Sequence, residues 1–495
     1  MSVLPERNVS FFEECYYQRN VTDFYSNFFV SATYDNRKGK DFKRILAKSL
    51  RNLILKHPIL YTNVYKNEKI NRLVLRPVES INFKDLVEFE EHETLFDHPN
   101  SLNGHVMQEI IHSKFKYGNL DEPLWKLKVI NNETLIFYCD HILFDGTSGA
   151  NFHEKLLHEF NDVSKAEDET EAKKVLENND IKLFDLEDDA QYVKPLQESI
   201  YGAMCKTDIK FIAGNLYSQY APAWLQKIPE KLYEYFFPSP IEQSKENSLT
   251  PTGSLYENTN YLARKGAFTH DFKIVNIPPD RLSKLLKITR SNEVSLTALI
   301  MYVSLIALKN LTKDQDTITK FPISLRGKED LGKYDTTFGL FIKSGELVLP
   351  PLTNKPSPTT TDKVDWKVVK LINDKLKEVL VDDDNFKSIA MQRLFNDTKF
   401  FVKQLNKPLS STLEISNLGF KSFKDIDETA ADFMITDMLF SQSIGALGSN
   451  FSLDVISTKL GGMNIVLTTI PELREEYAYS IDLFEKLIIE LENNA

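Results

Sequence analysis

The chain has 495 residues, a net charge of −11 and three scattered cysteines. Its length predicts more than one ordinary hydrophobic core, and 42% hydrophobic with 26% interspersed charged residues is typical of a folded globular protein. The acidic balance argues against nucleic-acid binding, which needs clustered Lys and Arg, and the cysteines supply neither a disulfide framework nor a metal cluster.

The cysteine content and the chain ends also predict where the protein works. The N-terminus lacks an apolar signal core, and the most apolar window, residues 296–308, is too short to span a bilayer. Few cysteines fit a reduced intracellular setting. We therefore expect an intracellular protein that is soluble or peripheral on a membrane.

The first part of the chain predicts strands with a helix laid on them. A strand is expected over 27–34, and apolar residues then repeat at helical spacing over 40–56, where His57-Pro58 ends the helix. Short strands are expected near 60–65 and 72–75. Trp125, Leu127 and Val129 alternate with lysines, and the following Asn-Asn-Glu turn predicts an antiparallel hairpin.

The second strand of that hairpin leads into the segment on which the functional prediction depends. An apolar run over 135–139 ends at His141, an Asp145-Gly146 turn follows, and Thr147 or Ser148 is the expected N-cap of the next helix. A histidine at the end of a central strand is held rigidly where clefts open. His-x-x-x-Asp-Gly is also the pattern of acyltransferases that use coenzyme A thioesters.

This motif alone has rivals. His141 could be an ordinary histidine at a strand end. His158 also has an aspartate four residues later, but that match lacks the glycine and falls on a solvated helix face. His153 and His158 lie roughly 140° apart around a helix, so they do not form a zinc-protease motif. Cys139, in the middle of a strand, is more typical of a core residue than of a nucleophile, and no metal site is predicted.

The rest of the chain predicts a crossover and a second half of similar construction. Residues 162–189 are acidic and poor in apolar residues, and 195–240 mix aromatic residues with lysines and glutamates, as in a helical cover or a lid lining an apolar tunnel. The second half then alternates strands and helices. Its expected strands lie at 267–277, 321–325, 412–416, 433–441, 451–457 and 463–470, and its helices near 280–290, after Ser295, at 366–381, at 385–405 and at the C-terminus. The predicted class is α/β (α+β), with a first half at 1–190, a crossover at 191–265 and a second half at 266–495.

Several segments spread over nearly the whole chain resemble the fungal alcohol acetyltransferase family. That family is part of the wider group that resembles chloramphenicol acetyltransferase, plant acyltransferases and peptide-synthetase condensation domains. The segments that carry the resemblance are His141-Ile-Leu-Phe-Asp-Gly, Glu14-Cys-Tyr-Tyr-Gln-Arg, Tyr25-Ser-Asn-Phe, Ile415-Ser-Asn-Leu-Gly and Asp454-Val-Ile-Ser-Thr-Lys-Leu-Gly-Gly.

The resemblance implies a fold and a set of site residues. The fold would be two chloramphenicol acetyltransferase-like sandwich domains with mixed sheets and a tunnel between them. His141 would be the general base, reached by acetyl-CoA from one end and by the acceptor from the other. Asp145 would be mainly structural, paired with an arginine for which Arg326 is the candidate, although an ordinary surface arginine is an equal alternative. Gly146 would keep the turn tight.

A donor for the oxyanion is also needed, and Ser416 or Asn417 could supply it, unless Asn-Leu-Gly is only a turn.

The function implied is an acetyl-CoA-dependent O-acetyltransferase that forms an acetate ester on an alcohol, with acetyl-CoA as co-substrate, no bound cofactor and a monomeric state. The first alternative is an N-acetyltransferase of a long-chain or sphingoid-like amine, and the second is a catalytically silent binding relative. An acidic group near the acceptor mouth would favour an amine, and a purely apolar mouth an alcohol. Family members contact the endoplasmic reticulum or lipid droplets through amphipathic termini, but the acidic last helix here departs from that pattern.

Overall fold

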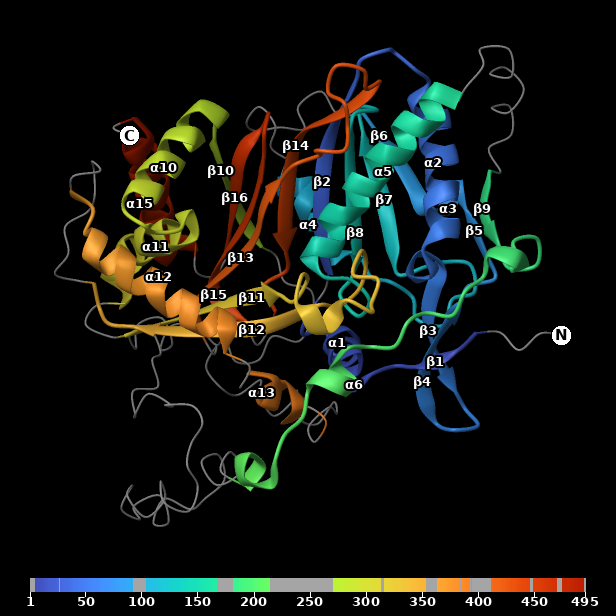
Figure 1. Cartoon of the computed structure of the whole chain (residues 1–495), viewed down its shortest axis with the longest axis horizontal. Helices are drawn as coiled ribbons and strands as arrows, with labels where there is room; N and C mark the ends of the chain where they lie inside the picture. The colour runs from blue at the N-terminus through green and yellow to red at the C-terminus, as the bar shows by residue number, and fades with distance from the viewer. Residues whose placement is uncertain are drawn as a thin grey trace.

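Two mixed β-sheets, lying side by side with helices packed against them, form the framework of the molecule (Figure 1). They are seen in a computed structural model of the chain, which describes residues 5–25, 27–91, 104–166, 181–213, 270–312, 316–352, 363–382, 385–391, 393, 411–445, 448–469 and 474–493.

The first sheet is built mainly from the N-terminal part of the chain. Its five strands lie in the order β14 (Phe433–Gln442), β2 (Asn27–Asn36), β8 (Thr134–Asp140), β7 (Trp125–Ile130) and β6 (Val87–Glu90). All neighbours are antiparallel except β6 and β7. The three-residue turn between β7 and β8 has positive φ at both Asn131 and Asn132, a conformation that asparagine adopts more readily than most residues.

Helices α2 (Phe42–Lys56) and α5 (Gly146–Ala166) pack together over this sheet. Asp41 caps α2, because its Oδ1 accepts a hydrogen bond from the Arg44 amide at 3.1 Å. The apolar residues of α2 that repeat at helical spacing, such as Ile45 and Leu53, are fully buried. The predicted helix over 40–56 is therefore present, and its apolar face lies in the core.

The second sheet comes from the C-terminal part of the chain. Its six strands lie in the order β10 (Asp271–Ile277), β16 (Gly462–Thr469), β15 (Ser449–Thr458), β13 (Ser411–Lys421), β11 (Thr317–Ser324) and β12 (Ile342–Leu349). The β11–β13 and β13–β15 pairs are parallel and the others antiparallel. The helices that share a core with it are α10 (Pro279–Ser291), α11 (Leu296–Thr312), α12 (Trp366–Val381) and α15 (Arg474–Asn493).

Strand β14 joins the two halves. It belongs to the C-terminal part of the sequence but pairs antiparallel with β2 over Phe433–Gln442, at the edge of the first sheet (Figure 1). It also packs against β15 and β16 of the second sheet. The two sheets therefore do not divide at the predicted boundary of residue 266, because β14 lies after that residue in the sequence but belongs to the first sheet.

Shorter elements surround the two sheets. β1 (Arg7–Asn8), β4 (Arg72–Pro77) and β3 (Thr62–Asn67) form a small sheet, and β5 (Ser80–Asn82) pairs with β9 (Lys182–Asp185). The remaining α-helices in the described ranges are α1 (Phe11–Val21), α3 (Phe83–Leu86), α4 (Gly104–His112), α6 (Tyr201–Met204) and α13 (Asn385–Met391).

Most predicted elements are present, with corrections. The sequence does not predict helices α1 and α4, strands β6 and β12, or the short elements β1, β5, β9, α3 and α6. Helix α5 begins at Gly146, so neither Thr147 nor Ser148 is its N-cap. Residues 214–240 of the aromatic segment, 267–269 of the expected strand over 267–277, and 392 and 394–405 of the expected helix over 385–405 lie outside the described residues.

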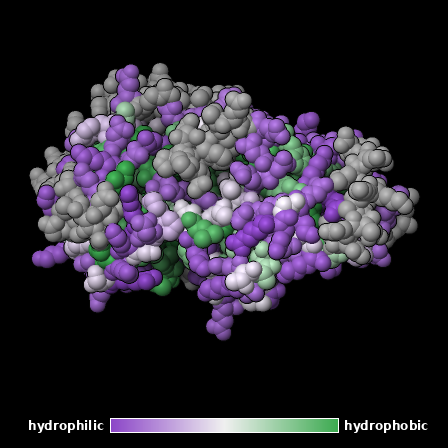
Figure 2. Space-filling view, turned by 90° about the horizontal axis from the view of Figure 1, so that it is seen from above, coloured by the Kyte–Doolittle hydropathy of each residue, from purple (hydrophilic) through white to green (hydrophobic). Residues whose placement is uncertain are grey.

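No single helix in the described ranges is long and apolar enough to cross a bilayer. Helices α10 and α11 reach that length and apolar content only together, as a pair bent by 98°. On the face shown in Figure 2, most of the described residues are hydrophilic, and the apolar ones occur in small separate groups.

Candidate active site

His141 follows directly after β8, where the chain turns toward α5. β8 is the central strand of the first sheet, held by β2 and β7, and the His141 side chain is buried. Its imidazole stacks on the ring of Tyr16, with centroids 4.2 Å apart and planes 13° apart, and Phe28 lies edge-on at 5.1 Å. Packing therefore holds the ring in one orientation.

Burial keeps this imidazole neutral. It lowers the pKa of His141 to about 4, whereas the backbone carbonyls of His141 and Phe144 and the Asp145 carboxylate act in the opposite direction. Nδ1 is enclosed near those carbonyls without a hydrogen bond of standard geometry to any described residue. Nε2 is therefore the nitrogen left to accept a proton from a molecule in the adjoining cavity.

The residue before His141 fixes the turn. The Asp140 carboxylate accepts hydrogen bonds from the Tyr117 hydroxyl at 2.5 Å, the Asn20 side-chain amide at 2.9 Å and the Ile142 backbone amide at 2.8 Å. Burial raises the pKa of Asp140 to about 6, against these three hydrogen bonds. The backbone on either side of His141 is thus tied to α1 and to the segment after α4.

Asp145 forms the centre of a buried polar cluster on the far side of the turn. Its Oδ2 accepts from Arg326 Nη1 at 2.7 Å and from the Phe341 amide at 2.9 Å, and its Oδ1 accepts from the Ser148 amide and hydroxyl. Arg326 also donates to the Thr336 carbonyl at 2.7 Å. Arg326, which follows β11 of the second sheet, is therefore ion-paired with Asp145 rather than lying free on the surface.

This cluster also explains how α5 begins. The Asp145 carboxylate accepts the Ser148 amide three residues later, which is the contact an N-cap makes, and Gly146 is the first helical residue. A Cβ at Gly146 would lie 2.8 Å from Leu418 Cδ2. Gly146 thus lets β13 of the second sheet approach the turn closely.

A cavity of about 340 Å³ opens between the two sheets beside His141. One wall comes from α1, β2 and the His141 turn, and the other from strands β11, β13 and β15. The volume is within the usual range of small-molecule sites. Its lining includes His141, Asp145, Gly146, Ser416 and Asn417, so the cavity brings together every predicted site residue except Arg326.

The two candidate oxyanion donors differ in their surroundings. Ser416 is buried in the cavity wall, and its hydroxyl forms no hydrogen bond with any residue the structure describes. Asn417 is exposed; its amide nitrogen donates to Thr297 Oγ1 at 3.0 Å and its oxygen accepts the Gly419 amide at 2.8 Å. Asn417 is therefore occupied by turn chemistry, and Ser416 is the better placed donor.

Sequence reasoning missed several cavity residues. Helix α1 presents Phe12, Tyr16 and Arg19 to the cavity. The signal was available, because Ser10 and Glu13 form a capping box that marks the start of this helix. Glu414 was missed as well, although it precedes Ser416 by two residues and so shares its face of the strand.

Comparison with known proteins agrees with this geometry. The sequence model of the alcohol acetyltransferase family matches residues 8–488. The chain belongs to the alcohol acetyltransferase family. The prediction of the family and of an acetyltransferase-type enzyme is thereby confirmed, whereas the acceptor is not.

Two relatives of this chain are proteins of the yeast Saccharomyces cerevisiae. The N-acetyltransferase SLI1 of Saccharomyces cerevisiae is 22% identical over 485 residues, which is 93% of this chain and 94% of that protein. PSTB2-interacting protein 1 of the same yeast is 26% identical over 370 residues, which is 70% of this chain and 66% of that protein.

Several solved structures are similar to this family member in fold. Trichothecene 15-O-acetyltransferase TRI3 from Fusarium sporotrichioides has a TM-score of 0.62 at 12% identity, over 98% of this chain and 95% of that one. The epimerization domain of the third module of tyrocidine synthetase B has a TM-score of 0.57 at 13% identity, over 99% and 97%. The predicted condensation-domain and acetyltransferase type of α/β fold is confirmed.

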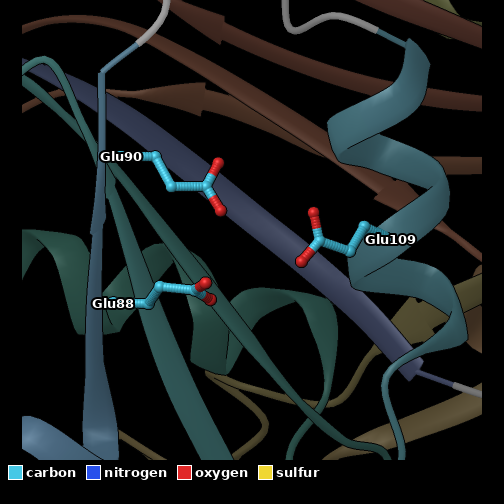
Figure 3. A group of neighbouring side chains, drawn as sticks. All are labelled: Glu88, Glu90 and Glu109. Carbon is cyan, nitrogen blue, oxygen red and sulfur yellow. The ribbon is translucent and has the colours of Figure 1, made fainter.

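Three carboxylates surround a lysine at a second place in the structure, away from the cavity beside His141. Glu88 and Glu90 on β6 and Glu109 on α4 point toward one another (Figure 3). The ammonium of Lys128 lies 3.2 Å from Glu88 and 3.0 Å from Glu109, and it also contacts Glu90. Lys128 supplies the positive charge that a metal ion would bring, so the cluster is an ion-pair network.

Proposed function

We propose that this chain is an acetyl-CoA-dependent acetyltransferase in which His141 is the general base. The observation that supports this most strongly is a buried imidazole, its pKa lowered to about 4 by burial, in the lining of a cavity between the two sheets. A general base must be unprotonated and rigidly placed, and the low pKa and the ring stacking of His141 support both conditions.

The reaction proceeds by addition and elimination at the thioester. An amine acceptor binds as its ammonium and first releases one proton to water. The neutral nitrogen, or an alcohol oxygen, then attacks the acetyl carbonyl carbon, a C–N or C–O bond forms, and the acceptor proton passes to His141 Nε2. The tetrahedral intermediate then breaks its C–S bond, and the coenzyme A thiolate takes that proton from His141. The products are the acetylated acceptor and free coenzyme A, so the base is regenerated.

The neighbouring residues have distinct parts in this scheme. Asp145 and Arg326 hold the turn that carries His141, because the carboxylate is bonded to both the guanidinium and the start of α5. The Ser416 hydroxyl donates to the oxyanion, since it lies unpaired in the opposite wall.

Two acceptor classes fit the scheme. An alcohol accords with the family's description and was the first choice from sequence. An amine is favoured by a carboxylate in the cavity wall, Glu414, because an acidic group attracts an ammonium. The name of one relative, an N-acetyltransferase, supports the same choice. We therefore place the amine first and the alcohol second.

The test is acetyl transfer by the purified full chain. Acetyl-CoA is incubated with octylamine or with 1-octanol, coenzyme A release is followed as free thiol, and the products are identified by mass spectrometry. The proposal predicts N-acetyloctylamine, or octyl acetate if the alcohol is used. Thiol release equal to that of the acceptor-free control with both acceptors would contradict it.

A further inference from the structure

Glu414 projects from β13 into the same cavity as His141. Strand alternation places Glu414 and Ser416 on one face, while Leu413 and Ile415 face the core of the second half. The parallel register sets Glu414 beside Ser452 of β15, which also lines the cavity. A carboxylate therefore stands in the wall opposite the predicted base.

This carboxylate has no counter-ion among the described residues. Its oxygens accept only long hydrogen bonds from neutral donors, 3.3 Å from Gln442 Nε2 and 3.4 Å from Ser449 Oγ. Burial raises the pKa of Glu414, against the charges of Lys320 and Arg19, neither of which forms an ion pair with it within 4.0 Å. A cation beside this half-buried carboxylate would stabilise its ionised form, so the site is suited to receive one.

Two buried hydroxyls beside Glu414 also lack partners. Tyr25 Oη and Ser452 Oγ both line the cavity and form no hydrogen bond with the described residues. Ser452 is 3% exposed and Tyr25 9% exposed. A carboxylate and two hydroxyls offer three acceptors, which matches the three N–H donors of a primary ammonium.

A second acid, Asp454, lies next to Glu414 but outside the cavity lining. Asp454 is fully buried and accepts hydrogen bonds from Ser441 Oγ and from the Gln442 amide. Burial first and Glu414 second raise the pKa of Asp454 well above its ordinary value. Of the two acids, only Glu414 lines the cavity, so Glu414 is the one that a cation in the cavity would meet.

We propose that Glu414, Tyr25 and Ser452 bind the ammonium group of the acceptor and so select amines over uncharged alcohols. This rests on the proposed acetyl transfer, and it assigns this wall to the acceptor, since a carboxylate repels the phosphates of coenzyme A. The acceptor class is a primary alkylamine or an amino alcohol.

Binding without turnover tests this assignment separately from the reaction. Octylammonium chloride and 1-octanol are titrated calorimetrically into the full chain, wild type and Glu414→Gln. We expect the octylammonium Kd to rise at least 10-fold in the variant, about 1.4 kcal/mol, and the octanol Kd to change less than 2-fold. An octylammonium Kd that is unchanged, or that rises together with the octanol Kd, would overturn the proposal.

Two further variants keep the test decisive. Glu346→Gln removes an exposed carboxylate from β12 that lies 3.8 Å from Lys320 but does not line the cavity, so it should leave both Kd values unchanged. Tyr25→Phe keeps the carboxylate and removes one acceptor. It should weaken octylammonium binding by about 3-fold or more without affecting octanol, even if Glu414→Gln fails to fold.

Kinetics then separate the two proposals. If the wild type transfers acetyl groups and Glu414→Gln lowers kcat/KM for octylamine and octanol by the same factor, the ammonium site is wrong and the acetyltransferase stands. If octylammonium binds through Glu414 but neither acceptor is acetylated, the ammonium site stands and the reaction is wrong.

Discussion

The chemistry of His141 depends on a ring that stays neutral, and this has a consequence for pH. An imidazole with a pKa of about 4 is unprotonated at pH 5.5, where an ordinary one would be about nine-tenths protonated. We expect kcat/KM with 1-octanol, which does not titrate, to fall by less than 2-fold between pH 7.5 and 5.5.

Asp140 is the nearby group that could obscure this result, because its pKa is about 6. The pH profile is therefore measured for Asp140→Asn as well. A midpoint near 6.5 in both proteins would show that burial does not shift His141.

Asp145 and Arg326 test what a buried ion pair contributes. Asp145→Asn leaves the guanidinium without its charged partner at a site where the carboxylate is almost fully buried. We expect the free energy of unfolding, from denaturant titration, to fall by about 3–5 kcal/mol. Asp35→Asn, which breaks an exposed pair with Arg37, serves as the control and should cost less than about 1 kcal/mol. Equal losses in the two variants would contradict the structural role of Asp145.

Ser416 and Asn417 make opposite predictions for the oxyanion. Ser416→Ala should lower kcat by about 10²-fold with little change in KM, because a donor to the oxyanion acts in the transition state. Asn417→Ala should have a much smaller effect on kcat, since its amide is engaged with Thr297 and Gly419. The reverse order of effects, measured by thiol release, would move the donor to Asn417.

For single residues, the sequence predicted some contacts of the candidate site and not others. The pairing of Arg326 with Asp145 could be anticipated because a buried carboxylate needs a cation, and the family pattern pointed to an arginine. Glu414 and Tyr25 could not be assigned, because their meaning depends on which wall they share with His141.

At the scale of elements, the contact between α5 and β2 depends on one glycine. A Cβ at Gly149 would lie 2.6 Å from Val30 Cγ2. Gly149→Ala should therefore destabilise the protein by about 1–3 kcal/mol through overpacking. Gly104→Ala, where nothing lies within 4 Å, is the matched control and should be neutral or slightly stabilising. Thermal unfolding followed by circular dichroism measures both, and equal stability of the two variants would argue against close packing at Gly149.

Helices and strands whose apolar residues repeat at a regular spacing could be predicted, and those that lack such a repeat could not. Around His141 the pattern changes from a continuous apolar run to helical spacing, and this change shows where the strand ends and the helix begins. In β12 the inward position 345 is glycine, because the Phe321 ring fills the space where a side chain would lie. That gap interrupts the alternation by which a strand is recognised.

At the scale of the whole molecule, β14 makes the two sheets dependent on each other. It completes the first sheet at β2 and packs on β15 and β16 of the second. We therefore expect one cooperative unfolding transition in calorimetry rather than two. Two well-separated transitions would show that the halves fold independently.

The sequence gives least indication that β14, from the C-terminal part of the chain, joins the first sheet. Its alternation predicts a strand over 433–441, but local pattern does not say which sheet receives it. The choice depends on pairing with β2, about 400 residues earlier in the chain.

The central claim, that His141 is the base of an acetyl transfer, is tested most directly by removing its imidazole. kcat/KM for acetyl transfer to octylamine is compared among wild type, His141→Ala and His158→Ala, after circular dichroism shows that the variants are folded. His158 has the same spacing to an aspartate but lies on α5 outside the cavity lining, so it controls for loss of any histidine. We predict a loss of about 10²- to 10⁴-fold for His141→Ala and less than 2-fold for His158→Ala. Activity of His141→Ala within 10-fold of the wild type would contradict the account.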